Sequence, residues 1–151
     1  MTITRVNAET ILIKRCGATL TAVGLDGTTI DGSNTDINDP LWDSLRRLGY
    51  TVTNISSVND ADIASVSTDD ERAFLDVAEL RLLESAYNAA IALVDVSVGP
   101  RRESLSQLAA NIDKAVTRKR EQVQAEHGLT GNELVAGVYS VASLEDGDNV
   151  Y

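Results

Sequence analysis

A break at Gly99-Pro100 separates two long stretches in which apolar residues recur at helical spacing. The first stretch begins near Thr68, and the second runs from Pro100 to about Glu126. Proline suits the first position of a helix, where its missing N–H has no intrahelical partner, so Pro100 restarts a helix after the break. The two stretches cover more than a third of the chain. They predict a mainly α fold, a small helical bundle built on two long helices.

The first long helix carries two apolar stripes along its length. Thr68 and Glu71 have the spacing of a capping box, so the helix is expected to begin there. Two stripes on one helix require apolar neighbours on two sides. The sequence leaves two sources open for these neighbours, the interior of the chain's own domain or an adjacent subunit. The first stripe holds Leu75, Ala78, Leu82, Ala86 (or Ser85), Ala89 and Leu93, and the second holds Val77, Leu80, Tyr87, Ile91 and Val94.

The second long helix has one apolar face and carries many of the chain's cations. The net charge of the whole chain is −10, whereas residues 101–127 have a net charge of +2. Cations near a helix C-terminus are favoured by the helix dipole, so a solvated helix end is the simpler explanation for Lys114, Arg118, Lys119 and Arg120. The alternative is that this basic segment, with the pair Arg101 and Arg102, meets an acidic surface of another subunit or partner. We therefore treat the four arginines as candidate interface residues.

Shorter helices are expected before the two long ones. A first helix should run from Ala8 to about Val23, and a second from Asp39-Pro40 to Gly49, with Trp42 as a core anchor. Asn59–Val66 should add one or two helical turns. The segment between the first two helices is rich in glycine and aspartate, and its aspartates lack the ligand spacing of an EF-hand. It is predicted to be a loop of turns.

The end of the sequence differs from the rest. Residues 129–151 contain the only convincing strand-like run, followed by an acidic segment, so the chain is divided into a helical domain, 1–128, and an extended C-terminal arm, 129–151. An isolated strand cannot satisfy its own backbone hydrogen bonds, so it must be disordered, pair locally or join a sheet edge. Docking on a partner or neighbouring subunit is preferred. The candidate contact residues of this arm are Leu134, Val135, Val138, Tyr139 and Val141.

No motif in the sequence specifies a chemical reaction. Nucleophile-elbow, P-loop, dinucleotide and zinc-ligand spacings are absent, and nothing pairs Cys16 with His127, the only histidine. The acids Asp76, Glu79 and Glu84 lie near one helical side and are interpreted as a solubilising face. We expect no enzymatic activity, no cofactor and no metal. The acidic charge argues against general nucleic-acid binding. The absence of a signal or membrane-spanning segment predicts a soluble protein that is not secreted, and the single cysteine favours a reduced, cytosolic origin.

Three segments carry a resemblance to a known class of protein: 22–34, 39–52, and 80–108 with its Val98-Gly-Pro-Arg-Arg-Glu-Ser. They resemble small proteins from the structural modules of tailed bacteriophages, and the size and helical layout are similar to the head–tail connector, or adaptor, proteins of the phage neck. The resemblance covers about residues 10–128. No functional residue is transferred, since no motif of that family aligns residue by residue.

This resemblance implies a helical subunit of a homo-oligomeric ring, commonly a dodecamer, between the portal protein and the tail or stopper proteins. DNA would pass through such a ring without sequence-specific contact, and a terminal extension often reaches onto the adjoining ring. The protein would lie in the virion neck after assembly in the cytoplasm of the host bacterium. The alternatives are another virion component, such as a tail-completion or minor head protein, and a small helical regulatory or binding module.

Overall fold

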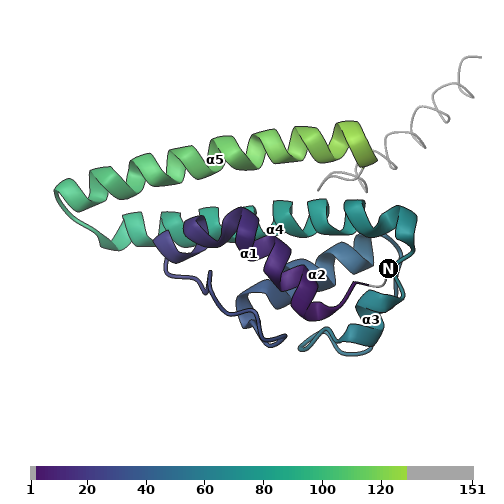
Figure 1. The fold of residues 1–151 in the computed structure, drawn as a ribbon. Coiled ribbons are helices and arrows are strands. Elements are labelled where there is room, and N and C mark those ends of the chain that lie inside the picture. Colours follow the sequence, from purple (N-terminus) through teal and green to yellow (C-terminus); the bar gives the residue numbers. More distant parts are fainter. Residues whose placement is uncertain (1–2, 129–151) are drawn as a thin grey trace, which may run out of the picture.

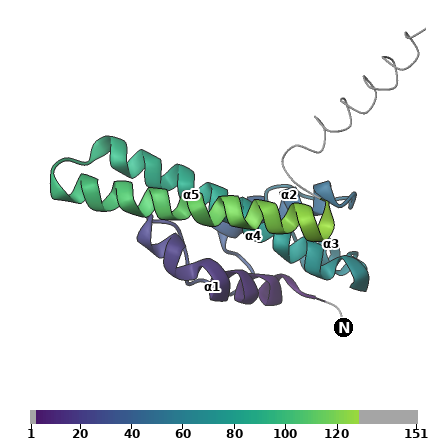
Figure 2. The ribbon, with the colours of Figure 1, turned by 90° about the horizontal axis from the view of Figure 1, so that it is seen from above.

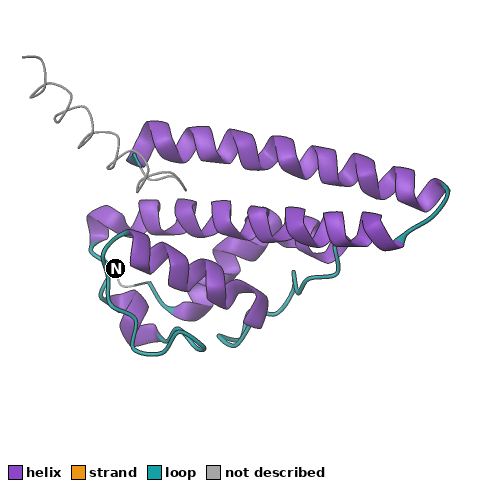
Figure 3. Cartoon of the chain, turned by 180° about the vertical axis from the view of Figure 1, so that it is seen from behind, coloured by secondary structure: helices purple, strands orange, loops and turns teal. Residues whose placement is uncertain are grey.

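The computed structural model describes residues 3–128, which form five α-helices and one short 3-10 helix (Figure 1). No strand occurs in this described part of the chain (Figure 3). The mainly α fold is therefore confirmed, whereas the expected C-terminal arm, with Leu134 to Val141, lies outside the described residues. The elements are α1 (Arg5–Ala22), α2 (Thr35–Arg47), α3 (Asp60–Ala64), η1 (Thr68–Asp70), α4 (Glu71–Val96) and α5 (Pro100–His127).

Helix α4 is the centre of the structure. It packs against α5 on one side and against α1 and α2 on the other, so the helices form layers with α4 in the middle (Figure 1). The residues of both apolar stripes are buried over the first four turns of α4. Other helices of the same chain thus supply the neighbours that the two stripes require. The largest fully buried side chains include Leu12, Leu20, Ile37, Leu41, Leu45, Phe74, Leu80 and Leu82.

The α4–α5 hairpin extends beyond the other helices. Figures 1 and 2 both show its closed end projecting past α1 and α2. Near this end the second stripe is less covered, since Ile91 is 38% exposed. Val96 and Val98, which follow the stripe, are 80% and 83% exposed. The predicted break is confirmed: α5 starts at Pro100, Gly99 has a positive φ of 67°, and the left-handed Gly128 ends the helix. Within residues 3–128, no helix is long and apolar enough to cross a membrane.

Three helix starts differ from the prediction. Helix α1 begins at Arg5, three residues before Ala8, with Thr4 as its N-cap. Helix α2 begins one turn earlier than expected, because the Asn34 side chain accepts a hydrogen bond from the Asp36 amide and caps it, which leaves Pro40 inside the helix. The capping box predicted at Thr68 and Glu71 is not formed, since Thr68–Asp70 is a 3-10 turn. The Asp70 carboxylate instead accepts a hydrogen bond of 2.6 Å from the Tyr50 hydroxyl.

The glycine-rich loop is stabilised by turns, as its composition predicts. The Asp26 carboxylate accepts hydrogen bonds from the amides of Thr28 and Thr29, and Asp31 accepts one from the Ser33 amide. Hydrogen bonds from the hydroxyl and amide of Thr29 lower the pKa of Asp26 to about 2. The aspartates of this loop are thus engaged with its own backbone.

A buried ion pair holds this loop and a second one against α1. Glu9 is fully buried, and its Oε1 accepts a hydrogen bond of 2.9 Å from Arg5 Nε. The same carboxylate accepts hydrogen bonds from the amides of Gly32 and Asn34, while the Arg5 guanidinium donates to the carbonyl oxygens of Asn34 and Val58. Each charged group is therefore satisfied inside the protein. This pair was not predicted from the sequence.

Candidate functional site

Charged side chains from three helices meet around Asp76, which is 3% exposed. Asp76 Oδ1 lies 3.2 Å from Arg15 Nη1 and 3.1 Å from Lys119 Nζ, and Oδ2 lies 2.8 Å from His127 Nε2. Glu79 Oε2 lies 2.9 Å from Arg15 Nη1 and 2.8 Å from Lys119 Nζ. We call these five residues the Asp76 cluster. It joins α1, α4 and the last turns of α5.

The electrostatics of the Asp76 cluster favour its ionised carboxylate. Burial raises the pKa of Asp76, but hydrogen bonds from His127 and Lys119 and the nearby positive charges of Lys119 and Arg15 outweigh burial and hold that pKa below its usual value. Removing one partner from such a buried group is costly because the remaining charge stays desolvated. The cluster therefore fixes α5 against α4 near the point where α5 ends.

The one cysteine lies close to this cluster without gaining reactivity from it. Burial and the negative charge of Glu79 raise the pKa of the Cys16 thiol to about 12. A thiol is nucleophilic as its thiolate, so Cys16 is held in the unreactive form near neutral pH. The Asp76 cluster is therefore not the kind of site in which a nearby base or cation activates a thiol.

Three potential metal ligands are also present there. One ligand atom each of Asp76, Glu126 and His127 lies within 4.8 Å of the others. The two carboxylates already form ion pairs with cations of the protein. Arg72 Nη2 lies 3.0 Å from Glu126 Oε2, and Lys119 Nζ lies 3.1 Å from Asp76 Oδ1. A divalent cation would have to displace these positive groups. The residues present therefore fit an internal ion-pair network better than a metal centre.

The prediction that Asp76, Glu79 and Glu84 of α4 form a solubilising face is wrong. Asp76 is buried, and Glu79 and Glu84 are only partly exposed and form ion pairs. The sequence did contain a signal for this network. Lys119, predicted to lie at a solvated helix end, is instead buried. It lies in helical register with Val116 and Val123 on the apolar face of α5, and this position indicates a buried partner for its charge.

The four predicted interface arginines lie in different environments. Arg101 and Arg102 are exposed at the start of α5, at the end of the hairpin, and Arg118 is exposed farther along the helix. No ion pair links these three to another residue within the described part of the chain. Arg120 Nη2, in contrast, lies 3.2 Å from Glu84 Oε1, so Arg120 forms an ion pair within its own chain. The remaining candidates, Leu134, Val135, Val138, Tyr139 and Val141, lie outside the described residues.

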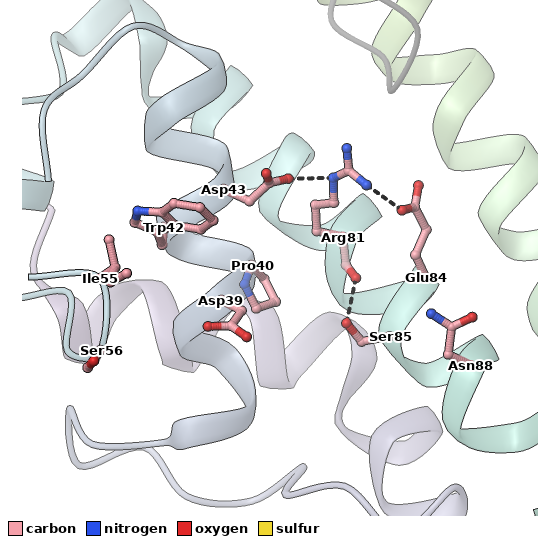
Figure 4. A pocket seen from close by; sticks show the side chains of 10 residues that line it. All are labelled: Asp39, Pro40, Trp42, Asp43, Ile55, Ser56, Arg81, Glu84, Ser85 and Asn88. Carbon is pink, nitrogen blue, oxygen red and sulfur yellow. Dashed lines mark hydrogen bonds and ion pairs between the residues drawn. The ribbon is translucent and has the colours of Figure 1, made fainter. Parts of the chain in front are cut away.

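A groove of about 530 Å³ lies between α2, α4 and the loop that holds Ile55 (Figure 4). Trp42 lines this groove and also packs against the core. Its predicted role as a core anchor therefore describes only the part of the side chain that faces the core. Arg81 lies between Asp43 and Glu84 and forms ion pairs with both (Figure 4). The groove is thus walled by apolar side chains on one side and by paired charges on the other.

A comparison of the chain with protein-family models, curated proteins and solved structures found no match in any of the three.

Proposed function

We propose that this protein is a non-enzymatic structural subunit of a tailed-phage virion, a head–tail connector that forms an oligomeric ring between the portal and the tail. The proposal is supported by the resemblance of residues 10–128 to phage neck proteins. The observation that carries it is the α4–α5 hairpin, whose closed end projects beyond the other helices with Val96 and Val98 exposed. Neighbouring apolar groups at the end of a projecting element would be buried by a contact with another chain, which would remove them from water.

The charge distribution supports contacts between subunits. Arg101, Arg102 and Arg118 are exposed cations without an ion pair in the part of the chain that the structure describes, while the chain as a whole has a net charge of −10. Positive groups of one copy would then meet acidic groups of the next, which favours a defined orientation between the copies. A contact between two different surfaces of the same protein generates a ring when the rotation closes.

The net negative charge of the chain favours a channel through which DNA moves. A negatively charged wall repels the phosphate backbone, so DNA would pass through the ring without binding to it. The portal protein and the tail or stopper proteins would be the partners on the two faces of the ring. The virion neck would be the location of the assembled protein.

The groove between α2 and α4 favours one alternative, a small helical binding module. Its exposed Ile55 and its Trp42 would form an apolar contact for a partner, and Asp39 would add an exposed negative charge. A module of this kind would act as a monomer and would bind its partner in this groove. Measurements of oligomerisation and portal binding therefore distinguish a connector from a binding module.

The experiment is to measure the mass of the full chain by light scattering during size-exclusion chromatography, alone and with the portal protein encoded in the same genome. A connector is expected to form a multiple of the 16.2 kDa chain, either alone or on the portal. A protein that stays monomeric in both conditions would contradict the connector function. A monomer that loses a partner on Trp42→Ala substitution would support the binding module.

A further inference from the structure

The closed end of the α4–α5 hairpin carries the two most exposed large apolar side chains of the described residues. Val96 is 80% exposed and Val98 is 83% exposed. Arg101 and Arg102 follow on the first turn of α5 and are exposed as well. We call residues 96–102 the hairpin tip. It combines an apolar end with two adjacent positive charges.

A second cavity lies on the side of the same hairpin. It has a volume of about 310 Å³ and is formed by both helices, with Tyr87, Ile91 and Val94 from α4. From α5 come the small residues Ser106, Ala109 and Ala110, which leave room between the helices, and Asp113. We call this cavity the flank groove. It is lined mainly by apolar groups, and Asp113 brings an exposed negative charge to it.

The hairpin tip and the flank groove are complementary in chemistry. The apolar valines match the lining of Ile91 and Val94, and the positive Arg101 and Arg102 match Asp113. None of these three charged residues forms an ion pair within residues 3–128, so each is available to a partner. Charge complementarity of this kind selects the partner and its orientation.

The tip cannot occupy the flank groove of its own chain. Ala110 lies ten residues after Pro100 in the continuous helix α5, which corresponds to about 15 Å along the helix axis. Val98 is held at the closed end by Gly99 and Pro100, so the two helices keep it away from Ala110. The complementary surface must therefore come from another chain, and a second copy of this chain offers it in its own flank groove.

We propose that the hairpin tip of one copy docks in the flank groove of a second copy. This inference rests on the proposed function in one respect, since it names the contact through which copies of this chain would join. The contact is heterologous, because the tip and the groove are different surfaces. Each copy uses its tip on one neighbour and offers its groove to another.

Paired cysteines test the contact in the full chain. A disulfide requires Cα atoms within about 7 Å, so V98C/A110C cannot close within one chain and should link separate chains under mild oxidation. The expected result is a ladder of linked oligomers in denaturing gels, with a disulfide between positions 98 and 110 identified by mass spectrometry. The matched control is V98C/A125C, in which the second cysteine replaces another exposed alanine on α5, far from the groove. This control and the wild type, whose Cys16 is buried, should give no ladder.

Charge reversal provides a second test that keeps the apolar groups unchanged. R101E/R102E should weaken self-association by about tenfold or more, measured by analytical ultracentrifugation. The variant should still fold, because glutamates are favourable near a helix N-terminus. Adding D113R restores opposite charges across the contact, so the triple variant should regain association. R46E, which reverses an exposed charge on α2, is the control and should associate as the wild type does.

The outcomes separate this inference from the proposed function. A disulfide between positions 98 and 110 that stops at covalent dimers supports the docking but contradicts a ring built through it. A ring in which V98C/A110C remains unlinked supports the connector function and overturns the docking. Linkage of V98C alone to a second V98C, without a link to A110C, would show tip-to-tip contact and would also overturn it.

Discussion

Replacing Glu9 with glutamine would remove one negative charge from a fully buried site while keeping the shape of the side chain. The Arg5 guanidinium, 4% exposed, would lose its counter-charge. With its oxygen kept toward Arg5 and Asn34, the new amide would place a donor against the Gly32 amide, where Glu9 Oε2 now accepts. Breaking a buried ion pair by removing one partner costs about 3–5 kcal/mol. Because glutamine keeps one acceptor oxygen, we expect a loss near the lower end, about 3 kcal/mol.

Urea unfolding followed by far-ultraviolet circular dichroism measures this loss. Since a domain of this size has a total stability of about 5–15 kcal/mol, E9Q should lower the unfolding midpoint clearly, and its melting temperature should fall by roughly 10 °C. The matched control is E121Q, the same substitution at an exposed position of α5, expected to change stability by less than about 0.5 kcal/mol. An E9Q variant within about 1 kcal/mol of the wild type would refute the role assigned to the buried pair.

Three further predictions concern the Asp76 cluster and the packing of α1. Because the folded-state pKa of Asp76 is lowered, its ionised form stabilises the protein above about pH 4 and this contribution is lost as the pH falls through the folded-state pKa. D76N should therefore be less stable than the wild type at neutral pH, with a difference that shrinks on acidification in urea titrations. Native Cys16, with a pKa of about 12, should resist alkylation at pH 8 and react after unfolding; equal rates in both states would contradict its burial. G17A should destabilise the protein by about 1–3 kcal/mol in thermal melts, although alanine favours helices, because a Cβ would lie 2.7 Å from the Gly27 carbonyl oxygen. A more stable G17A protein would disprove this close contact.

Much of the fold follows from local patterns in the sequence. The break at Gly99-Pro100 could be predicted because both residues have distinctive backbone preferences, and the two stripes of α4 correctly required neighbours on two sides. The start of α2 was misplaced for a nonlocal reason. The Asn34 side chain is held by the carbonyl oxygens of Asp26 and Thr29, and this loop conformation cannot be derived from helix signals alone.

The charged sites were harder to predict because they depend on tertiary packing. Lys119 on the apolar face of α5 signals a buried counter-charge, yet the sequence does not say which acid supplies it. His127 and Asp76 are 51 residues apart, and they meet only because α5 packs along α4. Arg101 and Arg102 were predicted as candidate contact residues, but the exposed valines of the hairpin tip were not. The proposed docking of the hairpin tip could not be predicted either, because the flank groove is formed only by the packing of both helices.

The proposed connector function is tested most directly by electron cryomicroscopy of the full chain, alone and mixed with its portal protein. We expect closed rings with a central channel, in which the α4–α5 hairpins of adjacent copies are in contact. Particles of a single chain in the first sample, together with portal particles free of this protein in the second, would contradict the function proposed for it.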